Sequence, residues 1–313
     1  MKTHLKLGFV VPAFFYVPYW AGVERGYYEQ AGLDVEITIF GGIDPLTQAL
    51  KKGDLDIGIG SPEHVIHDVE AGGRLRMIGG NVNRPTHDLI AQPEIKSLAD
   101  LKGKVLGVSS LSGGTSSLFI EILEKGAGLH ADKDYRMIPA GVVPPRHLRL
   151  LDRTIDACMQ TDPHNYMAED AGFSNLGPVA QWIPYFQFCS INLRADWGEA
   201  HRDIVERFLA ASIIASHWMA ENEDDAVELA VRNMGVDERY ARRAWHDHID
   251  GDALPLDLRL EPRSIETDLA MMRRDRHATI QIDPQASWDK YVDVTYLEAA
   301  QRRVRSHTGG SGI

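Results

Sequence analysis

Short apolar segments alternate with amphipathic segments through the first third of this chain, and this alternation limits the possible folds more than any other feature. Four apolar segments have the length and residue types of buried β-strands: residues 5–11, 35–40, 55–59 and 75–80. Helix-start signals follow three of them: Pro18, Asp44-Pro45 and Ser61-Pro62. Strands separated by helices of this length are typical of βαβ units, so the sequence predicts an α/β fold with a largely parallel sheet.

The same alternation begins again near residue 104. A strand at 105–108 leads into a loop rich in serine and glycine and then into a helix at about 115–127. Strands at 135–138 and 155–159 follow, again separated by a helical segment. After a further strand at 186–193 the chain reads as a series of helices. The sequence therefore predicts a second α/β lobe and extra C-terminal helices.

Charge and composition exclude several classes of partner. The chain has 33 Lys and Arg against 45 Asp and Glu in 313 residues, a formal net charge of −12. Nucleic-acid binding needs clustered basic residues, so no nucleic acid is expected as a partner. No segment approaches the ~18 apolar residues of a membrane span, so no membrane insertion is expected. Cys158 and Cys189 lie in apolar strand-like segments and are predicted to be buried free thiols.

The N-terminal residues bear on where the protein works. The chain opens MKTHLKLGFVVP, a basic start followed by an apolar run that Pro12 ends. The run is too short for an export leader and no small-residue cleavage site follows, so it is interpreted as the first strand. The chain as it stands is therefore expected in the cytoplasm, or in the periplasm if a leader has been trimmed from it.

The loop after the strand at 105–108 is the strongest candidate for a ligand site. From Ser109 to Ser116, five of eight residues are Ser or Thr and two are Gly, which is more than a helix cap requires. In open α/β sheets, ligands bind beyond the carboxyl ends of the strands, where helix N-termini carry free N–H groups and partial positive charge. We expect a carboxylate, sulfonate or phosphate group there. No Gly-Lys-Ser/Thr follows the glycines, so this is not a nucleotide P-loop.

The connection after the first strand, residues 14–20, is unusually aromatic. Trp20 is expected in the core, whereas Phe14, Tyr16 and Tyr19 are predicted to line one wall of a small-molecule site. Trp182 is the candidate for the opposite wall.

Titratable side chains near predicted strand ends allow an enzyme as well as a binding protein. Glu63 and His64 lie in the first turn of a predicted helix, and Arg84 and His87 follow another strand. These four are the candidate acid–base group. The alternative interpretation of His64 is a surface side chain, because the apolar face of its helix lies roughly opposite. The sequence has no metal-ligand spacing and no nucleophile motif, so no metal and no cofactor is predicted.

The order of elements resembles the substrate-binding proteins of ABC importers for sulfonates, nitrate and pyrimidine thiamine precursors, with their cytoplasmic relatives. The resemblance covers about residues 4–235. It is specific for the superfamily and weak for the ligand. The segments that carry it are GYYEQAGLDVEI (26–37), QALKKGDLDIGIGSPE (48–63), SLADLKGKVLGV (97–108), SLSGGTSS (110–117), IDACMQTDP (155–163) and INLRADW (191–197).

The resemblance implies a two-lobed, type II periplasmic-binding-protein-like α/β fold with hinge crossovers at about 90–98 and 186–193. One lobe is expected to hold residues 1–95 and 190–313, and the other residues 96–189. Ligand binding in a cleft between such lobes favours a closed form by hinge motion. With the aromatic walls included, the predicted ligand-binding residues are Phe14, Tyr16, Tyr19, Gly41, Gly42, Ser61, Glu63, Ser110, Ser112, Gly113, Gly114, Thr115, Ser116, Asp162 and Trp182.

Three functions are compatible with these residues. The first is a solute-binding protein for a small anionic or aromatic organic ligand, with an ABC importer permease as partner if the protein is exported. The second is a cytoplasmic decarboxylase- or desulfinase-like lyase on the same scaffold, with Glu63, His64, Arg84 and His87 as catalytic residues. The third is a ligand-sensing regulatory module, although the chain contains no helix-turn-helix for binding DNA. Fold alone does not choose between them.

Overall fold

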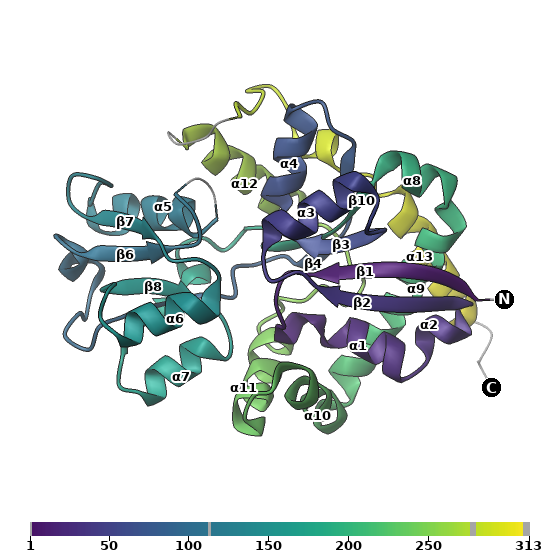
Figure 1. The fold of residues 1–313 in the computed structure, drawn as a ribbon, viewed down its shortest axis with the longest axis horizontal. Helices are drawn as coiled ribbons and strands as arrows, with labels where there is room; N and C mark the ends of the chain where they lie inside the picture. The colour runs from purple at the N-terminus through teal and green to yellow at the C-terminus, as the bar shows by residue number, and fades with distance from the viewer. Residues whose placement is uncertain (1, 112–113, 276–279, 309–313) are drawn as a thin grey trace. The chain divides into compact units, whose positions relative to one another are not determined.

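The computed structural model describes residues 2–111, 114–275 and 280–308, and the chain divides into two compact units (Figure 1). Unit 1 consists of Met1–Asn83, Gln187–Pro262 and Ala286–Ile313. Unit 2 consists of Arg84–Phe186 and Arg263–Gln285. Each unit is built on a mixed five-stranded sheet with helices packed on it, so the predicted α/β class is confirmed.

The sheet of unit 1 has the strand order β2-β1-β3-β10-β4, and β10 runs antiparallel to both of its neighbours. Its strands are β1 (Thr3–Phe9), β2 (Leu33–Ile39), β3 (Ile57–Gly60), β4 (Leu75–Val82) and β10 (Cys189–Arg194). The central strand β3 is buried along its whole length. A Cβ atom at Gly58 would lie 2.7 Å from Leu50 Cδ1, so the glycine allows the neighbouring helix to pack closely on this strand.

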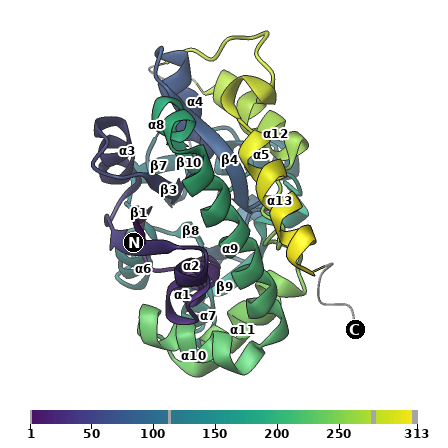
Figure 2. The same ribbon diagram turned by 90° about the vertical axis from the view of Figure 1, so that its right-hand side faces the viewer.

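Helices cover both faces of this sheet. The helices α3 (Ile43–Lys52) and α4 (Pro62–Glu70) lie on one side, and α1 (Val17–Glu24), α2 (Tyr27–Gln30) and α9 (Arg202–Glu221) lie on the other (Figure 1). C-terminal helix α13 (Thr295–Thr308) runs beside α9 (Figure 2). The remaining elements of the unit are η1 (Phe14–Tyr16), α8 (Ala195–Ala200), α10 (Glu223–Met234), α11 (Glu238–Ile249) and η4 (Trp288–Tyr291).

Local sequence explains where these helices begin and end, as α3 illustrates. Asp44 lies in its first turn and Lys51 and Lys52 in its last, which matches the helix dipole at both ends. Gly53 follows with φ 81°, a left-handed conformation that glycine adopts without strain, and it ends the helix.

The sheet of unit 2 has the strand order β7-β6-β8-β5-β9, and here β5 is the antiparallel strand. Its strands are β5 (Asp88–Ala91), β6 (Val105–Val108), β7 (Arg136–Pro139), β8 (Ala157–Gln160) and β9 (Ser174–Pro178). The helices α5 (Thr115–Ala127) and α6 (Val143–Leu151) lie on opposite faces (Figure 1). The other elements are η2 (Leu98–Leu101), α7 (His164–Asp170), η3 (Val179–Gln181) and α12 (Pro262–Arg274), which belongs to this unit from Arg263 onward.

The unit boundaries differ from the predicted lobe boundaries in two long segments, and residues 187–189 also belong to unit 1 rather than to the second unit. The strand β5 belongs to unit 2 because it pairs with β8, with Asp88 opposite Gln160. Residues 263–285 also belong to unit 2, where Arg274 Nη1 lies 2.9 Å from Glu121 Oε2. Both segments are tied to their unit by tertiary pairing, which the periodicity of a single segment does not reveal.

Both cysteines are free and buried, as predicted. Burial raises the pKa of the Cys158 thiol to about 12 and also raises that of Cys189. Neither thiol is therefore present as a nucleophilic thiolate near neutral pH. None of the helices in the described residues is both long and apolar enough to span a membrane.

Candidate ligand site

One edge of the unit 2 sheet gathers polar side chains from several strand ends. Ser109 directly follows β6, Gly141 comes two residues after β7, and Asp162 comes two residues after β8. The antiparallel strand β5 begins at this same edge, because its first residue pairs with the last residue of β8, and His87 precedes it. This is the edge at which open α/β sheets bind ligands.

Hydrogen bonds join the first residue of the loop before α5 to the first residue of that helix. The Ser109 N–H donates to Thr115 Oγ1 over 2.8 Å, and the Thr115 N–H donates to Ser109 Oγ over 3.4 Å. Thr115 is the first residue of α5, a helix of 13 residues, and its side chain is buried. The helix N-terminus, which favours negative charge, is thereby fixed at the polar edge.

Sequence analysis missed three side chains at this edge, His147, His164 and Arg146, and of these Arg146 carries a permanent charge. It lies on α6 and is only 2% exposed. Its Nη1 donates to the Gly141 carbonyl oxygen over 3.3 Å and, more weakly, to Thr115 Oγ1 over 3.5 Å. Its Nε has no hydrogen-bond partner among the described residues. Burial lowers the pKa of Arg146, but a guanidinium stays protonated in proteins, so a buried positive charge faces neutral oxygens here.

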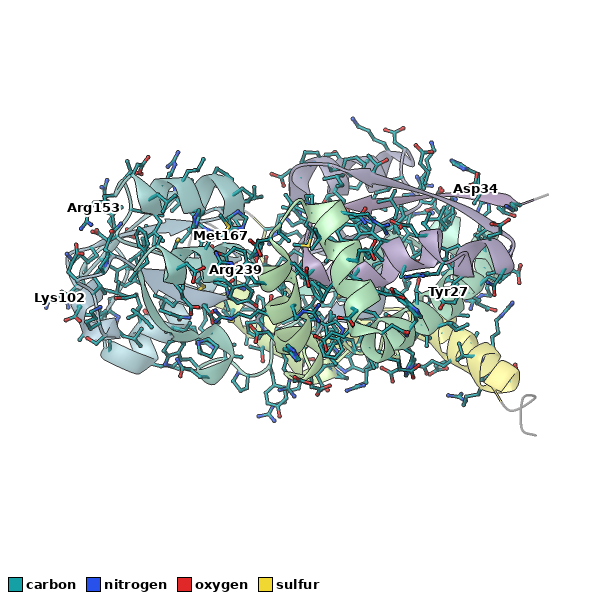
Figure 3. All side chains as sticks on the ribbon, turned by 90° about the horizontal axis from the view of Figure 1, so that it is seen from below. Tyr27, Asp34, Lys102, Arg153, Met167 and Arg239 are labelled. Carbon is teal, nitrogen blue, oxygen red and sulfur yellow. The ribbon has the colours of Figure 1, made fainter. Side chains whose placement is uncertain are left out.

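Two other basic side chains of unit 2 are paired with carboxylates, whereas Arg146 is not. Lys102 Nζ lies 3.6 Å from Asp134 Oδ1, and Arg153 pairs with Glu94. Both basic side chains project from the surface of unit 2 (Figure 3). Within the ranges that the structure describes, Arg146 forms no ion pair with a carboxylate. Burying an uncompensated charge is unfavourable, so this position is suited to receiving an anion.

Three histidines lie at the same edge in their neutral form. Burial and the charge of Arg146 lower the pKa of His87 to about 3, against the opposing effect of the Asp162 carboxylate. Burial, with smaller effects from His147 and Arg146, lowers the pKa of His164 to about 4. The rings of His147 and His164 have their centroids 5.2 Å apart, and burial also lowers the pKa of His147. A neutral imidazole has one donor and one acceptor, so each ring can bind an oxyanion through its N–H.

We call this group of side chains the Arg146 cluster. Its residues are His87, Thr115, Arg146, His147, Asp162 and His164.

The corresponding edge of unit 1 holds the predicted residues at the start of α4. Ser61 Oγ donates to Glu63 Oε2 over 3.0 Å, and His64 Nδ1 lies 3.8 Å from Asp44 Oδ1 of α3. The His64 side chain is 27% exposed, so it does not lie on a fully solvated helix face. Burial lowers its pKa, and the Asp44 carboxylate opposes this. These contacts lie within unit 1, and a role in ligand binding stays a prediction.

The predicted glycines of unit 1 occupy the connection between β2 and α3. Gly41 has φ 73°, a conformation that glycine adopts without strain, and Gly42 immediately precedes the helix in an extended conformation.

The aromatic residues predicted to line a wall are packed inside unit 1. The Phe14 ring stacks on His248 with centroids 5.4 Å apart, and the Tyr16 ring stacks on Phe9 at 4.0 Å. Phe14, Tyr16 and Tyr19 are each 1% exposed or less. Contact with a ligand would therefore require neighbouring side chains to move. The sequence does not separate these rings from Trp20, because all of them fall in one continuous apolar stretch.

Replacing Tyr19 with Phe tests whether this ring serves the core or a ligand. Its hydroxyl donates to Asn81 Oδ1 over 2.8 Å in a buried position, and the change leaves that acceptor unpaired. We expect a loss of about 1–3 kcal/mol in the free energy of unfolding, measured by urea titration, with ligand affinity unchanged. Tyr27→Phe, at a partly exposed tyrosine (labelled in Figure 3), is the control and should cost less than about 0.5 kcal/mol. A tenfold loss of affinity in Tyr19→Phe would instead show that the ring contacts the ligand.

The other predicted residues in the loop before α5 and in the first turn of that helix differ in how exposed they are. Ser116 is buried, Ser110 is exposed, and Gly114 precedes α5 with φ 57°. Ser112 and Gly113 lie outside the described residues.

Trp182 and Arg84 are two other predicted residues of unit 2, and they lie in different surroundings. The Trp182 Nε1 atom lies 4.0 Å from the position of a Cβ on Gly126, near the C-terminal end of α5. That end is roughly 16 Å along the helix from Thr115, so the structure does not bring Trp182 to the Arg146 cluster. Of the candidate acid–base group, His87 belongs to the cluster and Arg84 is exposed.

The described residues include no group of three or more His, Cys, Asp or Glu side chains arranged to hold a metal ion.

Two α/β units, each built on a mixed five-stranded sheet, define the fold class of this protein. The chain has the fold of the type II periplasmic binding proteins. A ligand-binding component of an ABC-type import system from Staphylococcus aureus superposes with a TM-score of 0.79 at 14% identity, covering 96% of this chain and all 100% of that one. The chain belongs to the NMT1/THI5-like family, whose sequence profile matches residues 14–226, and the resemblance seen in the sequence is confirmed.

Two further solved structures agree on the fold, and a protein from Brucella abortus is similar in sequence. The alkanesulfonate-binding protein of Xanthomonas axonopodis pv. citri superposes with a TM-score of 0.68 at 16% identity, over 86% of this chain and 91% of that chain. A desulfurization enzyme has the same fold, with a TM-score of 0.63 at 17% identity over 96% and 99% of the two chains. A Brucella abortus protein named "Putative binding protein" is 26% identical over 218 residues, 69% of this chain and 66% of the relative. The match thus spans just under two thirds of that relative's length.

Proposed function

We propose that this protein is a solute-binding protein that holds a small organic anion through Arg146. The observation that carries the proposal is a buried guanidinium whose hydrogen-bond partners among the described residues are neutral oxygens. Because Arg146 is 2% exposed and its Nε is buried, neighbouring side chains would have to move to admit an anion. An anion placed against Nε and Nη would then supply the missing counter-charge with directed, charge-assisted hydrogen bonds. Sulfonate, carboxylate and nitrate groups all have oxygens suited to this geometry.

Three other members of the Arg146 cluster, His87, Thr115 and His164, support the same ligand class. The N-terminus of α5 contributes partial positive charge beside Thr115. His87 and His164, which are neutral near pH 7, offer ring N–H donors and add no competing negative charge. The similarity to an alkanesulfonate-binding protein agrees with a small anionic solute.

The proposed partner is the permease of an ABC importer, which the protein can serve only if it is exported. The hinge closure predicted from the sequence remains part of this proposal. Small-angle scattering with and without a bound ligand tests it, because closure would lower the radius of gyration.

A thermal-shift screen with mass spectrometry tests the proposal. Alkanesulfonates, aromatic carboxylates, nitrate and pyrimidines are each added to the purified protein, and each mixture is then analysed for unchanged ligand. A ligand present at 100 times its Kd should stabilise the protein by about 2.7 kcal/mol and be recovered unchanged. If no anion raises the melting temperature, the proposal is wrong.

The same screen examines the lyase alternative, which the shared fold of a desulfurization enzyme keeps relevant. Loss of the ligand with release of carbon dioxide or sulfite would establish turnover. A desulfinase-like reaction through a cysteine nucleophile is disfavoured, because burial raises the pKa of both thiols far above neutral pH. Glu63, His64, Arg84 and His87 would then be the residues to replace.

A further inference from the structure

Gln160 is a buried amide side chain at the same edge of the unit 2 sheet. It is the last residue of β8 and is fully buried. Among the described residues its side chain makes one hydrogen bond, in which Nε2 donates to Cys158 Sγ over 3.0 Å, and its Oε1 has no partner. A thiol sulfur is a weak acceptor, so this bond compensates little of the cost of burying an amide.

Gln92, another buried glutamine of unit 2, shows what a structural amide does in this chain. Its Nε2 donates to the carbonyl oxygens of Leu150 and Ile155 over 2.8 and 3.1 Å. Its Oε1 also lacks a partner, but its N–H groups satisfy two backbone carbonyls. Gln160 satisfies no backbone group within the described ranges, so an apolar side chain of similar size would serve the fold at least as well.

The geometry of α6 and β8 brings Gln160 and Arg146 to the same edge. Leu150 of α6 and Cys158 of β8 pack in one hydrophobic cluster. Arg146 lies on the same helix face as Leu150, about 6 Å nearer the N-terminus of α6, and Gln160 lies on the same strand face as Cys158, about 7 Å nearer the carboxyl end of β8. Because α6 begins just after the carboxyl end of β7, which runs parallel to β6 and β8, both steps lead to the same edge.

The electrostatics of Cys158 agree with this placement. Burial raises the pKa of its thiol to about 12, and the charge of Arg146 and the hydrogen bond from Gln160 both oppose the increase. Both side chains therefore lie near the same sulfur atom.

We propose that Gln160 recognises a hydrogen-bond donor, an O–H or N–H group, on the same ligand whose anionic group Arg146 binds. The inference rests on the proposed function and narrows the ligand class to small organic anions that carry a hydroxyl or amino group. Arg146 Nε is a donor without a partner, and Gln160 Oε1 is an acceptor without a partner, among the described residues. The two atoms together are complementary to a ligand that carries an anion and a donor.

The amide oxygen of Gln160 would discriminate against ligands that lack the donor. A ligand hydroxyl placed against Oε1 would supply the missing partner, whereas a methyl group there would leave the oxygen buried and unpaired. A site built to hydrogen-bond a hydroxyl rejects an analogue without it far more strongly than an apolar pocket rejects a change of one methylene. Gln160 is as enclosed as Arg146, so the movement that admits the anion must also uncover Oε1.

Two matched pairs of sulfonates test the inference. 2-Hydroxyethanesulfonate and propane-1-sulfonate have the same charge and similar size, and they differ in a terminal O–H against a methyl group. 3-Hydroxypropane-1-sulfonate and butane-1-sulfonate repeat the comparison with one more methylene between the two ends of the ligand. Calorimetric titration of the full chain should give at least tenfold tighter binding of the hydroxyl member in at least one pair. A smaller preference in both pairs, or no binding of any of the four, would overturn the inference.

The variant Gln160→Met removes the amide at nearly the same volume. We expect the preference for the hydroxyl member to fall to less than a third of the wild-type ratio, with affinity for the alkanesulfonate little changed and the melting temperature no lower. A smaller fall in the ratio would contradict the inference. Equal loss of affinity for both members would contradict it too, because the amide would then be donating through Nε2 to the anion.

Gln92→Met is the matched control, because it makes the same substitution at a buried position beyond the opposite end of β5. It leaves the Leu150 and Ile155 carbonyl oxygens without their donor, so it should lower the melting temperature and keep the wild-type preference. Loss of the preference in Gln92→Met as well would show that the ratio responds to packing in general, and the role of Gln160 would be wrong.

The same titrations distinguish failure of this inference from failure of the proposed function. If Arg146→Met abolishes binding of both members of a pair while Gln160→Met keeps the wild-type preference, the anion site stands and the role of Gln160 is wrong. If Arg146→Met binds both members as the wild type does, Arg146 does not receive the anion and both proposals fail.

Discussion

The variant Arg146→Met is expected to lose its anionic ligand and yet to be more stable than the wild type in the absence of ligand. Burying a guanidinium without a counter-charge costs several kcal/mol, and only neutral oxygens compensate it here. Methionine fills a similar volume without a charge. We expect the free energy of unfolding to rise by about 1–3 kcal/mol and ligand affinity to fall at least a hundredfold. Opposite changes in stability and binding are characteristic of a charge retained for function.

Urea titration of the ligand-free protein measures the first effect, and calorimetry with a hit from the anion screen measures the second. The matched control is Arg149→Met, one turn further along α6, where the exposed side chain donates to the Pro139 carbonyl oxygen over 3.0 Å. It should change stability by no more than about 0.5 kcal/mol and leave affinity unchanged. If Arg146→Met destabilises the protein and retains the ligand, Arg146 is a structural residue.

Acid is expected to destabilise the protein through His87. Its pKa is about 3 in the folded protein, mainly because of burial, against an ordinary value of 6.5. Between these values the unfolded chain binds more protons than the folded one, so the free energy of unfolding falls as the pH falls. The slope for one such group approaches 1.4 kcal/mol per pH unit, or about 3 kcal/mol from pH 6.5 to 4. Above pH 7 the group is neutral in both states and makes no difference.

The variant His87→Gln should remove this contribution and flatten the dependence of stability on pH below 6.5. Urea titrations at several pH values between 4 and 8 measure it. His217→Gln, at an exposed position on α9, is the control and should leave the wild-type slope unchanged. A slope that is the same in His87→Gln and the wild type would show that acid acts through other groups.

Much of the fold is predictable from the sequence because its elements are signalled locally. The strand segments near 5–11 and 105–108 and the helix-start pairs such as Ser61-Pro62 fall where the structure has strands and helix N-termini. The local sequence does not indicate in the same way which of the two units a segment belongs to. The strand β5 has four residues, and its membership depends on pairing with β8, a segment almost 70 residues further along.

The central residue of the site escaped prediction because α6 reverses the usual pattern of burial. Leu148 and Leu151 are 63% and 43% exposed, whereas Arg146 and His147 are buried. A reader of the sequence expects the opposite, since leucines at this spacing normally face the core. A helix beginning at Pro144-Pro145 whose first turn carries Arg and His, next to a predicted strand end, is the signal that could have identified it.

Asp162 and Thr115 were predicted from the sequence, because each lies directly after a predicted strand or its loop. The side-chain contacts of Thr115 were not predictable in this way. The hydrogen bonds that Thr115 makes with Ser109 and Arg146 join β6, α5 and α6, and such three-way contacts follow from tertiary packing alone.

The order in which unit 1 is assembled has a consequence for synthesis on the ribosome. Its sheet places β10, residues Cys189–Arg194, between β3 and β4, so a ribosome must translate more than a hundred residues after β4 before the middle of that sheet can form. The sheet of unit 2 is encoded without interruption between Asp88 and Pro178. Until β10 has been synthesised, the edges of β3 and β4 that pair with it stay unpaired. Unpaired strand edges of this kind slow folding and expose the nascent chain to aggregation and to chaperones.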